Sequence, residues 1–178
     1  KLLKAPEHVG NVPTALGKEV YLMNIGVFGL FILAYYNLIG ASFNSVTFGL
    51  VFCMLCTANS GSHPGNVWPI MLGYVVGSFG FSYLSQLAGG NYAMTINAQA
   101  IAIGLCFANG LSPIASKYGW FWGMVSAVMH FLLVTSVPNM HGGFCLYNGG
   151  FTAAVICVLL VPVLEKCVKT KAEKAAAK

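Results

Sequence analysis

The chain has no aspartate and no arginine, and only 7% of its 178 residues are charged. Soluble domains average about 25% charged residues, and no soluble core of this length needs so much apolar surface. The stretches 20–116 and 118–164 contain no Asp, Glu, Lys or Arg. Because a charge at the centre of a membrane-spanning helix costs about 2.5–3.5 kcal/mol on insertion scales, this pattern predicts a membrane protein.

The missing charges also exclude classes of function. The nine lysines lie near the two ends and at position 117, so the net charge of +5 does not indicate nucleic-acid binding. The apolar stretches hold no carboxylate pair, no His/Glu metal motif, no Gly-x-Ser-x-Gly and no phosphate-binding loop. Ser62 and His63 are adjacent, which is the wrong spacing for a helical nucleophile and its base. We therefore expect no enzyme, no metal and no cofactor.

The cysteines and the first residues add two expectations. Cys53, Cys56, Cys106 and Cys157 lie within apolar runs, where cysteine acts as a small hydrophobic residue. Residues 1–19 have no apolar central region, so they do not resemble a signal peptide. The chain also lacks an initiator methionine, and we expect a fragment or a processed product.

Six apolar segments alternate with polar breaks, and they are residues 20–39, 44–58, 67–87, 96–110, 120–137 and 151–163. The second, fourth and sixth would be only about 20–23 Å long as helices, against a hydrocarbon core of about 30 Å. Each lies beside a Gly/Asn-rich segment, namely 59–66, 88–95 or 138–150. The sequence predicts an all-α polytopic transmembrane helical bundle of about six spans, some short or broken, with Gly/Asn-rich re-entrant segments. Turns in water between spans are the alternative.

The lysines predict the topology. With six crossings, residues 1–19, 111–119 and 166–178 fall on one side of the membrane and carry all nine lysines. The positive-inside rule then places both termini in the cytoplasm, with the protein in the inner (plasma) membrane. We divide the chain into a polar N-terminal arm (1–19), a transmembrane helical domain (20–165) and a basic cytoplasmic tail (166–178).

A shift of fifty residues aligns two parts of the chain. It places Leu55-Cys-Thr-Ala-Asn59 on Leu105-Cys-Phe-Ala-Asn109, Ser62 on Ser112 and Gly73 on Gly123. Two spans intervene, so the two copies would point the same way, as in transporters built from duplicated units. Gly73-x-x-x-Gly77 and Gly123-x-x-x-Ala127 match the small-xxx-small pattern for close helix packing, either within one chain or between chains.

Uncharged polar side chains are the candidate functional residues. His130 is mid-span, where a histidine needs a partner; a hydrogen bond to a neighbouring helix is the structural alternative to a functional role. We expect segment 59–66 to be buried in protein with His63 hydrogen-bonded. We expect segment 141–148 to fold back and offer Tyr147 and Asn148 to a solute, because the following span is too short. The candidates for a solute pathway are Asn59, His63, Asn66, Asn97, Gln99, Asn109, His130, His141, Tyr147 and Asn148.

The segment His141-Gly-Gly-Phe-Cys-Leu-Tyr-Asn-Gly-Gly-Phe-Thr-Ala-Ala154, running into Val161-Pro-Val-Leu-Glu165, carries a resemblance. It resembles the C-terminal half of a family of bacterial integral membrane proteins defined as a domain of unknown function. A Leu-Tyr-Asn-Asn-Gly-Phe-type stretch precedes the final span in that family, and Gly149 replaces the second Asn here. Members of the family are longer, which implies that this chain is half of a duplicated protein. Tyr147-Asn148-Gly149 is also similar to the pore half-helix segments of urea-type channels, although the aromatic slots of those proteins cannot be placed here.

These features favour a transporter- or channel-like module for a small neutral or weakly charged polar solute. The alternative is a non-transporting scaffold subunit of a larger membrane complex. The expected partners are the lipid bilayer, a small-molecule solute, and either the other half of a duplicated chain or a second copy in a homo-oligomer. A pore-forming module should hold a polar cavity bounded by the Gly/Asn segments, whereas a scaffold should be packed shut there.

Overall fold

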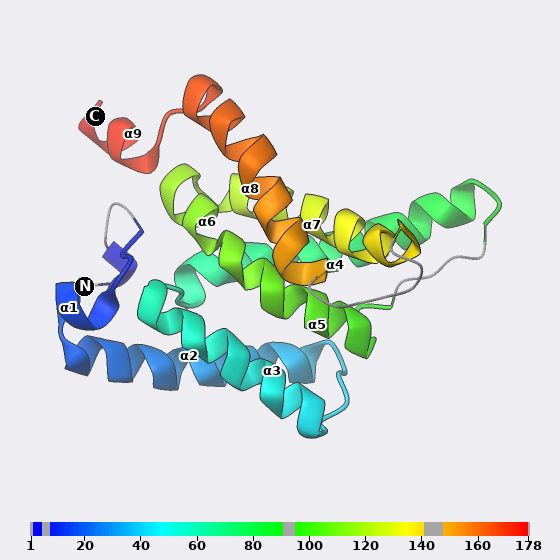
Figure 1. The fold of residues 1–178 in the computed structure, drawn as a ribbon, viewed down its shortest axis with the longest axis horizontal. Helices are drawn as coiled ribbons and strands as arrows, with labels where there is room; N and C mark the ends of the chain where they lie inside the picture. Colours follow the sequence, from blue (N-terminus) through cyan, green and yellow to red (C-terminus); the bar gives the residue numbers. More distant parts are fainter. Residues whose placement is uncertain (1, 5–7, 91–94, 141–147, 178) are drawn as a thin grey trace.

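The computed structural model describes residues 2–4, 8–90, 95–140 and 148–177. All regular structure in these ranges is helical, which confirms the predicted all-α class (Figure 1). In chain order the elements are η1 (Leu2–Lys4), α1 (Val12–Leu16), α2 (Lys18–Leu38), α3 (Ser45–Cys56), η2 (Thr57–Ser60), α4 (Pro64–Leu87), α5 (Gln99–Ala108), η3 (Asn109–Leu111), α6 (Ser112–Tyr118), α7 (Trp120–Met140), α8 (Asn148–Cys167) and α9 (Lys171–Ala176).

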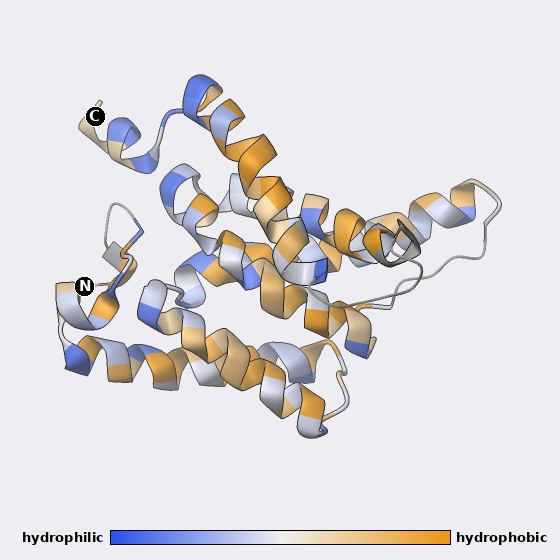
Figure 2. Cartoon of the chain, viewed as in Figure 1, coloured by the Kyte–Doolittle hydropathy of each residue, from blue (hydrophilic) through white to orange (hydrophobic). Residues whose placement is uncertain are grey.

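Five helical segments are long and apolar enough to cross a membrane: Lys18–Leu38, Pro64–Leu87, Gln99–Tyr118, Trp120–Val137 and Asn148–Ala176. A further apolar segment, Ser45–Ser60, is shorter. Large apolar side chains lie on the outside of these helices, and Figure 2 shows hydrophobic colour over much of α2, α3, α5 and α8. Such a surface suits lipid and not water, so the chain is a membrane-spanning helical bundle.

The helices pass back and forth through the bundle (Figure 1). Helices α2, α4 and α7 lead away from the end that holds the N-terminus, and α3, α5 and α8 lead back to it. We call this end, which also holds η2, α6 and α9, the lysine end, because the lysines of the described part lie in or beside the elements there. Lys117 of α6 pairs with Glu165 of α8 there, with 3.2 Å between the charged atoms. The predicted grouping of lysines on one side is therefore present in the fold.

Two of the three spans predicted to be short are full-length. Residues 111–119, expected to be a loop, continue the fourth span as η3 and α6, because Pro113 sits in the first turn of α6, where its missing N–H costs nothing. Helix α8 has 20 residues instead of thirteen, because its first polar turn is buried in protein. Helix α7 likewise continues to Met140, into the segment predicted to be a polar break. Only Ser45–Ser60 stays short.

Close packing of α4 against α7 forms the centre of the bundle. A Cβ placed on Gly73 would lie 2.6 Å from the Cβ of Ala127, and one placed on Gly77 would lie 2.9 Å from the ring of Phe131. Both distances are too short for real atoms, so only glycine permits this approach. A Cβ placed on Gly123 would likewise lie 2.5 Å from the Cβ of Ala115 in α6. The small-xxx-small patterns therefore pack helices within this chain.

The fifty-residue repeat has a counterpart in the fold. The first copy is α3, η2 and α4, and the second is α5, η3, α6 and α7. In each copy a helix leads back to the lysine end, a 3₁₀ turn follows, and a helix leads away (Figure 1). The copies therefore point the same way, as the alignment predicts.

Candidate functional site

Buried polar side chains join the two repeats at the lysine end. We call this group the polar seam, and it consists of Asn24, Ser62, Asn66, Ser112 and Ser116. The hydroxyl oxygens of Ser62 and Ser112 lie 3.0 Å apart, and the Asn66 amide donates to the Ser116 hydroxyl over 2.9 Å. Both pairs connect residues fifty positions apart. Equivalent positions can meet only near the axis that relates the two copies, so the polar seam marks that axis.

The turn into α4 positions the polar seam. His63 caps the helix, because its Nδ1 accepts from the Gly65 N–H over 3.0 Å while the side-chain Oδ1 of Asn66 accepts from the His63 N–H over 2.9 Å. The Asn24 amide of α2 donates to the carbonyl of Ser62 over 2.9 Å. His63 is thus hydrogen-bonded, as predicted. Segment 59–66 is buried only in part, because Ser62 and Asn66 are buried whereas Asn59, Ser60 and Gly65 are exposed. Its re-entrant geometry stays a prediction.

His63 is neutral at physiological pH. Burial, together with the nearby His8 and Lys171, lowers the pKa of His63 to about 4. The unprotonated Nδ1 is then free to accept the Gly65 N–H, so the protonation state and the helix cap agree.

Asn109 forms a second connection between the repeats. Its amide nitrogen donates to the Thr57 hydroxyl over 2.5 Å and lies 3.4 Å from the Met54 carbonyl oxygen. The Thr57 hydroxyl in turn donates a hydrogen bond to the same Met54 carbonyl oxygen over 2.7 Å. Asn109 is fully buried, whereas its repeat mate Asn59 is exposed. The two asparagines that the repeat alignment equates therefore have different roles.

A third polar group surrounds His130 in the middle of α7. Its Nε2 lies 2.9 Å from the Gly149 carbonyl oxygen, which can only accept, so Nε2 carries the proton. Nδ1 is then an acceptor, and the Tyr74 hydroxyl donates to it over 2.7 Å. Thr152 lies 3.0 Å from Nε2, and its hydroxyl also reaches the carbonyl oxygens of Asn148 and Gly149. We call Tyr74, His130 and Thr152 the histidine cluster; it ties α4, α7 and α8 together.

The other candidates lie elsewhere. Asn97 and Gln99 are exposed at the end opposite the lysine end, at the start of α5. His141 and Tyr147 lie outside the described residues. Asn148 is the buried first residue of α8, so the premise that the last span is too short to cross is wrong. The structure therefore sorts the candidates into separate groups and does not line them along one path.

The sequence analysis did not identify several of the residues in these polar groups. Asn24, Tyr74 and Thr152 are buried and hydrogen-bonded, yet each stands alone in an apolar run and carries no motif. Ser116 is half-buried and hydrogen-bonded to Asn66, in a segment that the sequence predicts to be a loop. The repeat held a usable signal for the serines, because it equates Ser62 with Ser112 and those two residues touch. The histidine cluster had no such signal, since Tyr74 and His130 are separated by 56 positions.

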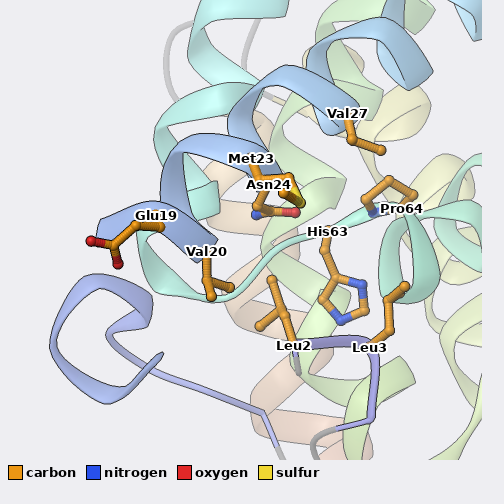
Figure 3. Close-up of a pocket in the computed structure, with 9 residues that line it drawn as sticks. All are labelled: Leu2, Leu3, Glu19, Val20, Met23, Asn24, Val27, His63 and Pro64. Carbon is orange, nitrogen blue, oxygen red and sulfur yellow. The ribbon is translucent and has the colours of Figure 1, made fainter. Parts of the chain in front are cut away.

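Two adjoining cavities lie at the lysine end, of about 340 and 70 Å³. The larger is lined mainly by apolar side chains of η1, α2 and the start of α4 (Figure 3). The smaller is bordered by polar groups, including Asn66 and Ser116 of the polar seam. Neither is lined by Asn109, His130 or Asn148.

Comparison with known proteins gives one family. The family model described as "Protein of unknown function (DUF1576)" matches residues 12–166, which include all six apolar segments. No curated protein and no solved structure matches the chain.

Proposed function

The chain belongs to the DUF1576 family, and we propose that it acts as a membrane transport module for a small, uncharged polar solute. The observation that carries the proposal is the placement of buried, uncharged polar side chains between two parallel repeats. The polar seam and the Asn109–Thr57 pair both lie there. Polar groups inside a membrane bundle are costly and mark solute pathways, and repeat-built transporters bind their substrates at the interface between repeats.

The chemistry of these groups limits the solute. The polar seam and the histidine cluster offer hydroxyls, amides and a neutral imidazole, and none of their members is a carboxylate, lysine or arginine. Such groups can exchange hydrogen bonds with an amide or an alcohol, but they cannot neutralise an ion. In the conformation described here they pair with one another. A solute therefore has to take over these hydrogen bonds, and transport requires the two repeats to separate.

A scaffold role is the second candidate, and one observation favours it. Both ring nitrogens of His130 are satisfied by protein groups, and the glycine contacts between α4 and α7 leave no space. A scaffold was expected to lack a cavity at its polar groups, and around His130 the bundle is packed shut in this way. The protein would then hold a larger membrane complex together, and its polar clusters would fix the order of its helices.

Solute flux separates the two candidates. The purified protein is reconstituted into liposomes, and uptake of urea and of glycerol is followed by light scattering, with protein-free liposomes as the baseline. The transport proposal predicts uptake of at least one of these solutes above the baseline. It also predicts that Asn148→Leu, which removes the buried side-chain amide at the first residue of α8 next to the histidine cluster, abolishes that uptake.

Asn37→Leu is the matched control, because Asn37 is exposed in the last turn of α2 and should leave uptake unchanged. Uptake that survives Asn148→Leu would remove Asn148 from the site. A folded protein that takes up neither solute would favour the scaffold.

A further inference from the structure

The two cavities at the lysine end lie side by side. They share Leu2, Leu3 and His63 as walls, so the space of one adjoins the space of the other. Figure 3 shows His63 at this boundary, between the two leucines of η1 and the α2 helix. One cavity is apolar and the other is polar and basic. This division corresponds to the two parts of a lipid.

The apolar side is a groove along the first turns of α2. Val20, Met23 and Val27 line it, and their spacing of three and four residues places them on one face of the helix. At 1.5 Å per residue these positions extend about 10 Å inward from the level of Val20. Met23 is 73% and Val27 54% exposed, so the groove opens on the outer surface of the bundle. Its volume of about 340 Å³ lies within the range of ligand-binding cavities.

The polar side is basic. Lys171, His8 and His63 border it together with the polar side chains of Asn66 and Ser116, and none of the described carboxylates does. Because His63 is neutral, Lys171 supplies the positive charge. The described carboxylates are engaged or directed elsewhere: Glu165 pairs with Lys117 and Glu173 caps α9. Glu19 lines the apolar cavity, but its carboxylate points away from His63 (Figure 3). Burial is the largest cause of the lowered pKa of His63, and the nearby His8 and Lys171 lower it further.

We propose that the two cavities together bind one anionic phospholipid. Its phosphate occupies the polar cavity beside Lys171, and one acyl chain lies along Val20, Met23 and Val27. The expected position in the membrane fits a phospholipid, because the lysine end would lie at headgroup level while the groove continues into the hydrocarbon region. The charge agrees as well, because basic pockets at the membrane surface select anionic headgroups. This site shares Asn66 and Ser116 with the polar seam but involves neither the histidine cluster nor Asn109, and its test measures lipid binding and not solute uptake.

Native mass spectrometry of the purified full chain tests the site. Phosphatidylglycerol is titrated against phosphatidylcholine with identical acyl chains, and the fraction of protein carrying one lipid is measured. We expect phosphatidylglycerol to bind at least tenfold more tightly. Lys171→Gln should weaken its binding roughly fivefold, the effect of one basic contact with the headgroup. Val27→Trp should fill the groove and weaken binding of both lipids.

Two matched controls use neighbours that border neither cavity. Lys174→Gln removes a charge from the same helix α9, and Leu22→Trp enlarges an exposed side chain of the same helix α2. Both should bind phosphatidylglycerol like the parent chain. Equal binding of the two lipids would overturn the proposal, as would equal losses for Lys171→Gln and Lys174→Gln. Displacement of phosphatidylglycerol by millimolar inorganic phosphate would also overturn it, because the site would then recognise the free anion.

Discussion

His130 shows how a single polar residue is accommodated in the middle of the bundle. The Gly149 carbonyl oxygen fixes the tautomer, and the Tyr74 hydroxyl donates to the remaining ring nitrogen. Both ring nitrogens therefore have partners, although the side chain is fully buried. The histidine was expected to be either functional or bonded to a neighbouring helix, and the structure shows the bond.

Removing the Tyr74 hydroxyl should destabilise the fold. Tyr74→Phe leaves the buried Nδ1 of His130 without its donor, and polar contacts inside membrane bundles contribute about 0.6–2 kcal/mol. We expect a loss of about 1 kcal/mol in the free energy of unfolding, measured by denaturant titration in detergent. Tyr83→Phe, at a tyrosine that is 63% exposed, is the control and should change little. Equal losses for the two variants would show that the hydrogen bond contributes nothing.

His63 makes stability depend on pH. Its pKa in the folded protein is about 4, below the ordinary value of 6.5, so the unfolded chain takes up a proton first as the pH falls. The stabilisation is complete above pH 6.5 and is lost as the pH falls towards 4. Thermal midpoints measured across this window should therefore decrease on acidification.

His63→Asn keeps a good N-cap but has no titrating group, so its midpoint should fall less over the same range. A weaker dependence of the thermal midpoint on pH should remain in His63→Asn, because burial also lowers the pKa of His8. The same pH slope in the parent and in His63→Asn would contradict the assignment to His63.

At the scale of elements, the contact between α4 and α7 decides how the bundle packs. Gly73→Ala would place a Cβ 2.6 Å from Ala127 and from the Met124 carbonyl oxygen, so the helices must move apart. We expect a cost of about 1–3 kcal/mol in the free energy of unfolding. Gly80→Ala is the control on the same helix, because its Cβ would meet nothing within 4 Å. That change should stabilise the helix by up to about 1 kcal/mol, and a loss as large as that of Gly73→Ala would argue against the close contact.

The same scale shows what the sequence could predict. The expulsion of charge correctly indicated six apolar segments, and the fifty-residue shift correctly indicated parallel copies. Segment lengths were wrong where polar residues are buried by neighbouring helices. Asn148 and Gly149 look like a loop in sequence, yet they form the first turn of α8, where Gly149 packs tightly against Phe107 of α5. Hydropathy of a single segment cannot anticipate burial that another helix supplies.

The candidate site was predictable only in part, because the sequence indicates single polar residues but not their partners on other helices. Asn109 and His130 are conspicuous because polar residues are rare in apolar runs, and both are buried and hydrogen-bonded. Their partners Thr57 and Tyr74 are ordinary in helices, and only the fold brings them close. Pairing across 50 residues or more is a tertiary property, which local spacing does not record.

At the scale of the whole molecule, the arrangement predicts topology. Both described ends, Leu2–Lys4 and Lys171–Ala176, lie at the lysine end of the bundle. From the positive-inside rule we expect this end to face the cytoplasm. Single cysteines at position 4 or 174, in a chain whose native cysteines are replaced, should resist a membrane-impermeant thiol reagent in intact cells and react after permeabilisation. Labelling of only one of the two positions in intact cells would contradict the arrangement of six passages.

The central claim is that a small uncharged polar solute passes between the two repeats. A reversible disulfide crosslink between the repeats tests this claim most directly. Ser62→Cys combined with Ser112→Cys, again without the native cysteines, places two thiols where hydroxyls now lie 3.0 Å apart at the repeat axis. We predict that uptake of urea or glycerol by reconstituted liposomes is lost when this pair is oxidised and returns when it is reduced, whereas uptake by either single variant does not change between oxidising and reducing conditions. Uptake that continues at the same rate through the oxidised pair would contradict the account.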